Sequence, residues 1–225
     1  MPSLTIENYV KTIYQICASQ DRQPAATGQV ASVLSVSPGT VTSMLKTLSE
    51  TGLATYTPYE GVQLTESGTG LALRVVRRHR LMELFLVKTL DLTWDEVHEE
   101  AEHMEHAVSD LLVDRIDAYL GYPDADPHGD PIPRHDGSMA SYDGSSLAQW
   151  QVGQPFRLVR VLDQSPNFLR YLSEAGLPLG TEGEVMAHLT EAGTVTVRVR
   201  AGETTLGRAA AEKLLVTTPP ETTGA

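Results

Sequence analysis

The chain has a single cysteine, Cys17, among its 225 residues. One thiol cannot form an intramolecular disulfide, so a disulfide-stapled fold is excluded. Cys17 falls in the apolar run of the first expected helix, and we interpret it as part of the core. The chain also lacks any run of about 18 apolar residues, and no charged start followed by an apolar stretch occurs at Met1. We therefore expect a cytoplasmic protein that neither is exported nor contacts a membrane.

Basic residues are scarce, with 17 Lys and Arg against 29 Asp and Glu, for a formal net charge of −12. This balance excludes a protein that binds DNA with its whole surface, because affinity for phosphates comes from Lys and Arg. The charge is uneven, however. Residues 1–90 have 8 basic and 6 acidic side chains, or +2, whereas residues 91–121 have 1 basic and 10 acidic, or −9. Ten clustered carboxylates indicate either a solvated face or a site that binds cations.

The first 65 residues have the pattern of a helix-turn-helix followed by a hairpin. Apolar residues at helical spacing predict a first helix ending near Ser19, and Thr27 is a plausible N-cap for a short second helix. The run PGTVTSMLKTLSETGL begins with Pro38 after a serine and contains Gly52 as a C-terminal stop, which predicts a third helix between these residues. Two strand-like runs then surround residues 59–61, as in the wing of a winged helix. An ordinary helix pair with a hairpin is the alternative.

The rest of the chain changes from helical to β-rich composition. A long helix is expected from Thr65 to about Leu90, and the sequence from Thr93 to Glu96 has the form of a capping box that opens another helix, with Ser109 as a candidate restart. Pro, Gly and Asp concentrate after Tyr122, which is typical of a linker. From about Leu147, short β-rich runs predict a small β-barrel. The fold class is therefore mainly α with a β-rich C-terminal domain.

Histidine and glutamate recur in the acidic segment at helical spacing. On one helix, His98, Glu102, Glu105 and His106 would form a single stripe, and His79 and Glu83 lie four residues apart in the preceding helix. Nitrogen and oxygen ligands without thiolate suit Mn²⁺ or Fe²⁺ better than a structural zinc site. The alternative is an exposed acidic face with incidental histidines.

Five segments together resemble the diphtheria toxin repressor family of iron- and manganese-dependent regulators: ENYVKTIY, SPGTVTSMLKTLSETGL, RRHRLMELFL, VHEEAEHMEH and HGDPIP. The resemblance covers nearly the full chain and implies a homodimer. It implies these domains: a winged helix-turn-helix (1–72), a helical dimerisation and metal-binding domain (73–121), a linker (122–146) and an SH3-like (FeoA-like) domain (147–225).

The resemblance also implies two metal sites. The primary site would comprise Asn8, Glu102, Glu105 and His106, and the ancillary site His79, Glu83 and His98. Glu102 stands where iron-responsive members usually have cysteine, so Mn²⁺ is the leading activator and Fe²⁺ the alternative. Asn8 and Lys11 depart from the carboxylates of the manganese branch, which favours separate sites over a binuclear one. The SH3-like domain would add Asp163 and Gln164 to the ancillary site.

The predicted function is that of a repressor that binds a pseudo-palindromic, double-stranded operator when loaded with metal. We expect four residues at the start of the third helix to read DNA, Ser37, Pro38, Thr40 and Ser43, with Thr27 and Lys46 on phosphates. Two alternatives remain: a hydrolytic enzyme that uses the His/Glu cluster, and a metal-independent winged-helix regulator. The sequence lacks the H-E-x-x-H signature of metalloproteases, and we expect no enzyme and no small organic substrate.

Overall fold

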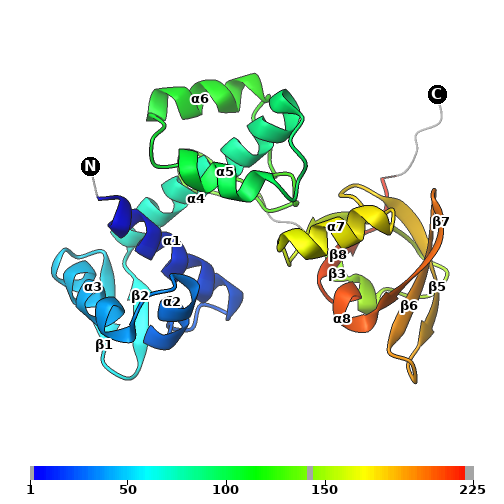
Figure 1. Cartoon of the computed structure of the whole chain (residues 1–225), viewed down its shortest axis with the longest axis horizontal. Helices are drawn as coiled ribbons and strands as arrows, with labels where there is room; N and C mark the ends of the chain where they lie inside the picture. Colours follow the sequence, from blue (N-terminus) through cyan, green and yellow to red (C-terminus); the bar gives the residue numbers. More distant parts are fainter. Residues whose placement is uncertain (1–2, 141–143, 221–225) are drawn as a thin grey trace. The chain divides into compact units, whose positions relative to one another are not determined.

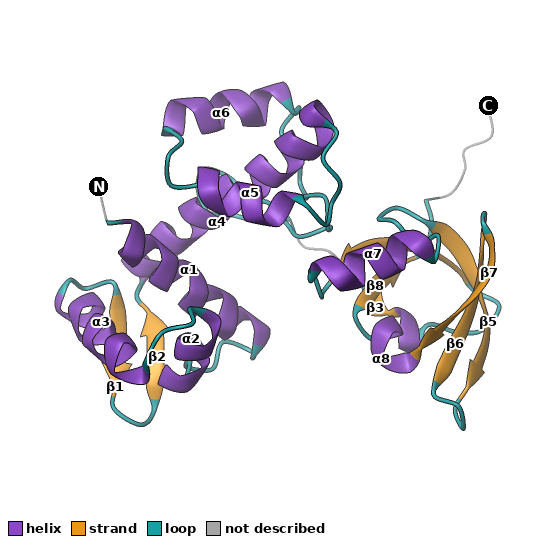
Figure 2. Cartoon of the chain, viewed as in Figure 1, coloured by secondary structure: helices purple, strands orange, loops and turns teal. Residues whose placement is uncertain are grey.

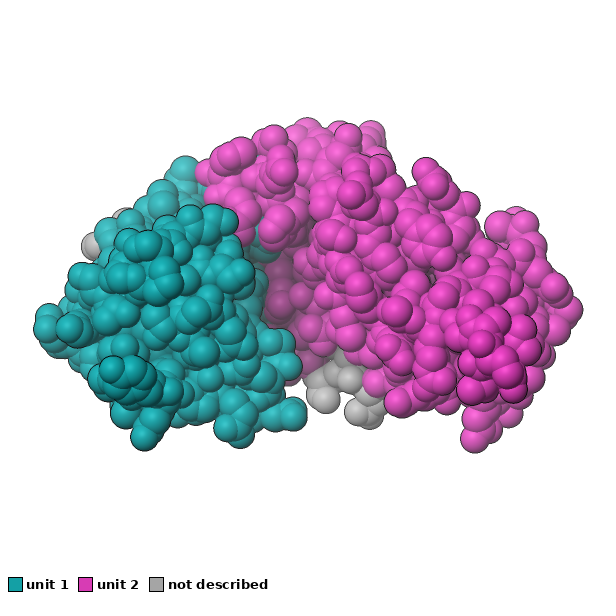
Figure 3. Space-filling model, turned by 60° about the horizontal axis from the view of Figure 1, so that its bottom comes forward, with its two compact units in different colours: residues 1–79, 104–109, 133–138 teal, residues 80–103, 110–132, 139–225 magenta. Residues whose placement is uncertain are grey.

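The structure, a computed structural model, describes residues 3–140 and 144–220 of the chain. The chain divides into two compact units, which Figure 3 colours separately. Unit 1 holds residues 1–79, 104–109 and 133–138, and unit 2 holds residues 80–103, 110–132 and 139–225. The chain first passes from unit 1 to unit 2 after residue 79, and two short later segments return to unit 1.

The N-terminal part of unit 1 is a winged helix. Its elements are α1 (Leu4–Ser19), α2 (Thr27–Val33), α3 (Pro38–Glu50), β1 (Ala54–Thr57) and β2 (Gly61–Leu64), as Figure 1 shows. The side chains of Val10, Ile13 and Leu45 are fully buried, at the positions where the helical period placed apolar residues. β1 pairs antiparallel with β2, with Ala54 opposite Leu64. The predicted helix-turn-helix and wing are confirmed.

The two helices of the helix-turn-helix begin differently. At α3 the Ser37 hydroxyl accepts a hydrogen bond from the Thr40 amide at 3.1 Å, and Pro38 is the first helical residue, as predicted. At α2 the prediction was wrong, because Thr27 is the first helical residue and Ala26 is the N-cap. The alanine methyl cannot accept a hydrogen bond. Instead, the Ala26 amide donates a hydrogen bond to the side-chain oxygen of Gln29, in the first turn of the helix, at 2.8 Å.

The wing is attached to the segment before α2. The amide and carbonyl of Ala25 exchange hydrogen bonds with those of Val62, each at 2.9 Å. Gly61 has φ +114°, and a Cβ there would lie 2.7 Å from the Ala25 carbonyl oxygen. The hairpin is thereby held against the helix-turn-helix by backbone contacts that require glycine at residue 61.

Three helices follow the wing: α4 (Glu66–Leu90), α5 (Val97–Met104) and α6 (Asp110–Tyr119). The amide and hydroxyl of Thr93 donate to one carboxylate oxygen of Glu96, at 3.0 and 2.7 Å, which is the glutamate half of the predicted capping box; the Glu96 amide donates to the Thr93 carbonyl and not to its hydroxyl. The helix itself begins later, at Val97, and ends at Met104. Glu105 and His106 therefore lie in the turn after α5, and the single helical stripe expected through them is wrong. Among the described residues, no helix has the length and apolar character to cross a membrane.

The segment from Tyr122 to Ile132 belongs to a packed loop of unit 2. His128 is fully buried and Asp126 is almost so, and the Val161 amide donates to the His128 carbonyl at 2.9 Å. Gly129 has a positive φ, and a Cβ there would overlap the Val159 carbonyl oxygen. The backbone of the loop thus lies directly against the backbone of residues 159–161. The division into four domains itself stays a prediction.

The C-terminal part of unit 2 is β-rich and SH3-like, as predicted. Figure 2 shows its strands and helices: β3 (Ser145–Ser146), η1 (Leu147–Gln149), β4 (Pro155–Val161), α7 (Pro166–Glu174), β5 (Glu182–Leu189), β6 (Thr194–Val199), β7 (Gly202–Gly207), α8 (Arg208–Ala211) and β8 (Leu214–Thr217). The strand order is β3-β8-β4-β5-β6-β7, and every pairing is antiparallel. Phe156, Leu158 and Val197 are among the buried residues of its core.

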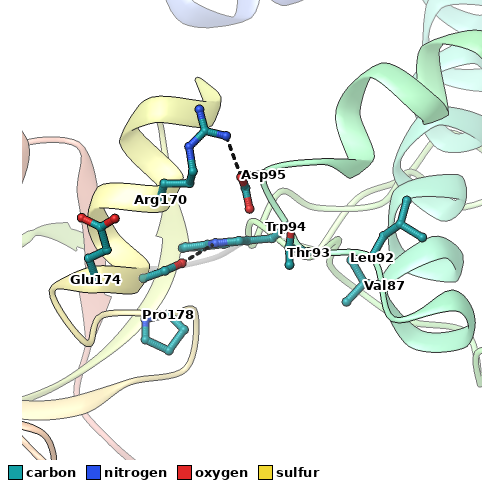
Figure 4. Close-up of a pocket in the computed structure, with 9 residues that line it drawn as sticks. Val87, Leu92, Thr93, Trp94, Asp95, Arg170, Glu174 and Pro178 are labelled. Atoms are coloured by element: carbon teal, nitrogen blue, oxygen red, sulfur yellow. Dashed lines mark hydrogen bonds and ion pairs between the residues drawn. The ribbon is translucent and has the colours of Figure 1, made fainter.

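Helix α7 contacts the loop that joins α4 to α5, and both lie in unit 2. The Trp94 indole N–H donates to the Ser173 hydroxyl at 2.9 Å, and Arg170 donates to Asp95 at 3.0 Å. Figure 4 shows these two pairs at the edge of a shallow apolar pocket that also includes Val87. Two polar contacts and a tryptophan side chain thus link the β-rich domain to the helical segment.

Candidate metal centre and nucleic-acid interface

A buried polar cluster lies in unit 1 between α1, α4 and the turn after α5. We call it cluster A, and it consists of Glu7, Asn8, Lys11, His79, Glu105 and His106. The residues at 7, 8 and 11 share one face of α1 because they are one, three and four positions apart. Glu105 is fully buried, and His79 is 5% exposed. Charged groups this deep require partners of opposite charge.

The imidazole of His106 is oriented by Glu7. Its Nδ1 lies 2.7 Å from Oε2 of Glu7, so Nδ1–H donates to the carboxylate and the Nε2 lone pair is left for another partner. Nε2 is buried and has no hydrogen-bond partner among the described residues, although Oε1 of Glu105 lies 3.1 Å away. Oδ1 of Asn8 is likewise buried without a partner in the part of the chain that the structure describes. An unsatisfied imidazole nitrogen beside a carboxylate, with an unsatisfied amide oxygen next to Glu7 on α1, is a donor set that fits a divalent metal ion.

Lys11 belongs to cluster A, although sequence reasoning identified it only as a departure from a carboxylate. Its ammonium lies 3.0 and 2.8 Å from the two carboxylate oxygens of Glu105 and 3.2 Å from Nδ1 of His79. Nδ1 of His79 also lies 2.7 Å from Oε2 of Glu105. The spacing of Lys11 from Asn8 on α1 was the available signal, since both point from one helical face.

A second buried cluster lies in unit 2. We call it cluster B, and it consists of Glu83 on α4, His98 on α5, and Asp126 and His128 on the packed loop. Nδ1 of His98 lies 3.2 Å from one oxygen of Glu83, and Nδ1 of His128 lies 3.8 Å from the other. Glu83, Asp126 and His128 each offer a ligand atom within 4.8 Å of the others. All three side chains are almost completely buried.

His128 and Asp126 have the properties expected of metal ligands. Nε2 of His128 lies 2.8 Å from the Trp94 carbonyl, which fixes its hydrogen there, and the buried Nδ1 has no hydrogen-bond partner among the described residues. Burial raises the pKa of Asp126 well above its usual range, and the charges of Glu83 and Asp130 raise it further against the effect of Arg80. A cation would relieve this repulsion. Sequence reasoning missed both residues because the loop was interpreted from its proline and glycine content as a linker.

The remaining predicted ligands have other surroundings. Glu102 lies on α5 with a side chain 43% exposed, and Oε1 is 4.0 Å from Nε2 of His98. Asp163 pairs with Lys213 at 2.7 Å, and the Gln164 amide donates to Asp130 at 3.2 Å. Of the predicted ancillary set, Glu83 and His98 are in contact, and His79 lies one turn before Glu83 on α4. The ligand sets as a whole stay predictions.

The residues predicted to read DNA lie on the exposed start of α3. Pro38, Thr40, Ser43 and Lys46 are exposed, and Thr27 is half-buried at the start of α2. Ser37 is exposed, but its hydroxyl already accepts the α3 capping bond and contacts the Thr40 hydroxyl at 2.8 Å. Tyr59, at the tip of the wing with φ +68°, is fully exposed. A protruding aromatic residue at the wing tip is a candidate DNA contact that sequence reasoning did not single out.

A winged helix with an exposed recognition helix, followed by helices that surround buried histidines and carboxylates, defines a transcriptional regulator of the winged-helix class. Family models support this part by part. Residues 1–62 match the iron dependent repressor N-terminal DNA binding domain, residues 65–134 match the iron dependent repressor metal binding and dimerisation domain, and residues 145–218 match the FeoA domain.

Individual relatives agree. The chain is 34% identical to the HTH-type transcriptional regulator MntR of Lysinibacillus sphaericus, over 52% of this chain and 81% of that protein. It is 35% identical to the iron-dependent repressor IdeR of Mycobacterium tuberculosis, over 57% of this chain and 55% of that one. A solved manganese-dependent transcriptional repressor in complex with manganese has a TM-score of 0.85 and 39% identity, over 95% of this chain and all of that chain. The chain belongs to the diphtheria toxin repressor family of metal-dependent transcriptional repressors.

Proposed function

We propose that this protein is a homodimeric repressor that binds a pseudo-palindromic operator when Mn²⁺, or alternatively Fe²⁺, occupies cluster A. The observation that carries the proposal is a pair of buried, unsatisfied atoms: Oδ1 of Asn8 on α1, and Nε2 of His106, which lies 3.1 Å from Oε1 of Glu105. Asn8 lies on α1 of the winged helix, and Glu105 and His106 lie in the turn that joins α5 to α6. A bound divalent ion would supply positive charge between these two segments.

The residues of this chain explain how such an ion would affect DNA binding. Glu7 orients His106, and Arg78 lies 3.6 Å from the other oxygen of Glu7, so α1, α4 and the turn already share one polar network. Ligation by both Asn8 and His106 would stabilise one position of α1 relative to the turn. The metal shifts the equilibrium only as far as it binds that arrangement better than others. Two winged helices held at constant spacing match half-sites about one DNA turn apart.

The choice of manganese rests on the donor atoms and on relatives. Cluster A offers amide and carboxylate oxygens with an imidazole nitrogen, and cluster B offers carboxylates with imidazoles, without thiolate in either. Such hard donors suit Mn²⁺, although intrinsic affinity alone would favour copper or zinc. A similar solved repressor contains manganese, and another neighbour is a ScaR structure with bound Zn²⁺. We propose that cluster B holds a second ion, with Glu83, Asp126, His98 and His128 as donors, and that Glu102, Asp163 and Gln164 are candidate additions.

The proposal of a homodimer is supported by the exposed apolar side chains of α6 and by the match to the family's dimerisation domain. Three large apolar side chains of this helix, Leu111, Leu112 and Tyr119, are exposed, and the match to the dimerisation domain covers them. Operator contacts would come from Pro38, Thr40, Ser43 and Lys46, with Ser37 and Thr27 beside them. A repressor bound to operator DNA acts in the cytoplasm, which is the location predicted from the sequence.

The first test is metal-dependent DNA binding. We would select duplexes from a random library with Mn²⁺ present, and then measure affinity by fluorescence anisotropy with Mn²⁺, Fe²⁺, Zn²⁺ or chelator. We expect chelator to lower the affinity at least about tenfold, a coupling near 1.4 kcal/mol. Equal affinity under all conditions would support the metal-independent regulator, and metal-dependent hydrolysis without DNA binding would support the enzyme.

The second test counts the ions and assigns them to clusters. Free Mn²⁺ is measured by electron paramagnetic resonance during equilibrium titration of the chain. We expect His106→Ala to remove one ion per chain and His128→Ala to remove a different one, because each replaces an unsatisfied donor. His103→Ala changes an exposed histidine that belongs to neither cluster, and it is the matched control. Full stoichiometry in His106→Ala would contradict the assignment of cluster A.

A further inference from the structure

We propose that the ammonium group of Lys11 is a built-in cation that occupies the His79 side of cluster A and limits this cluster to a single divalent ion. The inference rests on the proposed function, since it concerns the number and affinity of ions at the same cluster. It assigns to Lys11 a role in setting metal stoichiometry.

The geometry divides the Glu105 carboxylate into two sides. Oε2 lies 2.8 Å from the Lys11 ammonium and 2.7 Å from Nδ1 of His79, so these two groups already flank it. Oε1 lies 3.0 Å from Lys11 and 3.1 Å from the unsatisfied Nε2 of His106. An ion ligated by Nε2 of His106 therefore approaches Oε1, while Oε2 is already in contact with Lys11 and His79.

Burial makes the charge of Lys11 effective. Lys11 is 5% exposed and Glu105 is fully buried, so water screens their interaction little. A buried carboxylate without a counter-charge is strongly destabilising, and Lys11 supplies that charge whether or not metal is present. A second divalent ion on the His79 side would meet a full positive charge in direct contact with its carboxylate ligand. The cluster is therefore complete with one ammonium and one divalent ion.

The stoichiometric test uses Lys11→Glu. This variant removes the ammonium and adds a carboxylate next to Glu105 and His79, which are two ligands of the required kind. We expect equilibrium titration with Mn²⁺ to show one more ion per chain than in the wild type, with the spectrum of two coupled Mn²⁺ ions. Lys88→Glu makes the same charge change at an exposed position near the end of α4, and it should leave the count unchanged. An unchanged count in folded Lys11→Glu would overturn the inference.

A second variant covers the case in which Lys11→Glu does not fold. Lys11→Gln removes the charge and keeps a shorter polar side chain, and we expect the metal-free variant to melt several degrees below the wild type because Glu105 loses its counter-charge. The same variant should bind its first Mn²⁺ at least about tenfold more tightly, since the ion no longer faces an ammonium. A melting temperature and an affinity equal to those of the wild type would also overturn the inference.

The inference and the proposed function fail differently. If His106→Ala, made in the otherwise wild-type chain, binds as many ions as the wild type, the proposed metal site at cluster A is wrong whatever the Lys11 variants do. If His106→Ala removes one ion but Lys11→Glu adds none, the metal site stands and only the role of Lys11 is wrong.

Discussion

At the scale of single residues, the proposed metal site depends on which nitrogen of His106 is left for a ligand. The 2.7 Å contact with Glu7 fixes the hydrogen on Nδ1, so the lone pair of the buried Nε2 lies toward Glu105, whose Oε1 is 3.1 Å away. Glu7 is 8% exposed and is partly neutralised by Arg78. Glu7 is therefore a positioning residue, although sequence reasoning placed no role on it.

We predict that Glu7→Ala lowers the affinity for Mn²⁺ by about 10- to 100-fold, because the imidazole loses the partner that orients it. Isothermal titration calorimetry measures this change, and circular dichroism checks that the winged helix remains folded. Glu66→Ala changes an exposed glutamate in the first turn of α4 and should leave the affinity unchanged. Wild-type affinity in Glu7→Ala would mean that other contacts orient His106.

At the scale of elements, the wing depends on one close backbone approach. The bridge between Ala25 and Val62 needs Gly61, because any Cβ would overlap the Ala25 carbonyl and because φ +114° is unfavourable for other residues. Tyr59 at the tip is exposed, so its position follows from this bridge rather than from packing. The position of the wing relative to α3 thus depends on an interaction between segments that are far apart along the chain.

Gly61→Ala is predicted to destabilise the winged helix by about 1–3 kcal/mol, through strain at this φ and displacement of the bridge. Chemical denaturation followed by circular dichroism gives the free energy of unfolding. Gly28→Ala is the matched control, since a Cβ at that helical position would have no neighbouring atom within 4 Å, and it should be neutral or slightly stabilising. Equal stability of the two variants would show that the wing can move without cost.

At the scale of the whole molecule, Asp130 joins the packed loop of unit 2 to the β-rich domain. Its carboxylate accepts hydrogen bonds from Arg80 on α4 at 2.9 Å, from Arg160 on β4, and from Gln164 at 3.2 Å. The same loop holds Asp126 and His128 of cluster B. The proposed metal site at cluster B and the docking of the β-rich domain therefore involve one structural segment within this unit.

Asp130→Ala is expected to loosen this docking, because two arginines lose a shared, largely buried partner. Hydrogen exchange of the Val161 amide, which bonds the His128 carbonyl, reports on it, and we expect roughly a hundredfold loss of protection, about 3 kcal/mol. Glu212→Ala breaks an exposed pair with Arg208 and should leave that amide protected. Unchanged exchange in Asp130→Ala would show that backbone contacts alone maintain the junction.

Sequence signals between residues close along the chain determined many of the helix ends and the division into helical and β-rich parts. The serine cap and proline at the start of α3, the end of α1 at Ser19, and the β-rich composition after residue 147 were all legible in the sequence. They were legible because caps, turns and helical periods depend on residues a few positions apart. The exposed start of α3 follows from the same local pattern. The family resemblance rests on five segments that can be read directly in the sequence.

Tertiary structure alone decided the composition of the buried clusters. Lys11 meets Glu105 across 94 residues, and Asp126 and His128 reach Glu83 from a loop whose composition had indicated a linker. The end of α5 at Met104 likewise moved Glu105 and His106 out of a helical stripe and toward α1. Buried charges select their partners by distance and desolvation, and neither quantity is encoded in the spacing of residues along the chain.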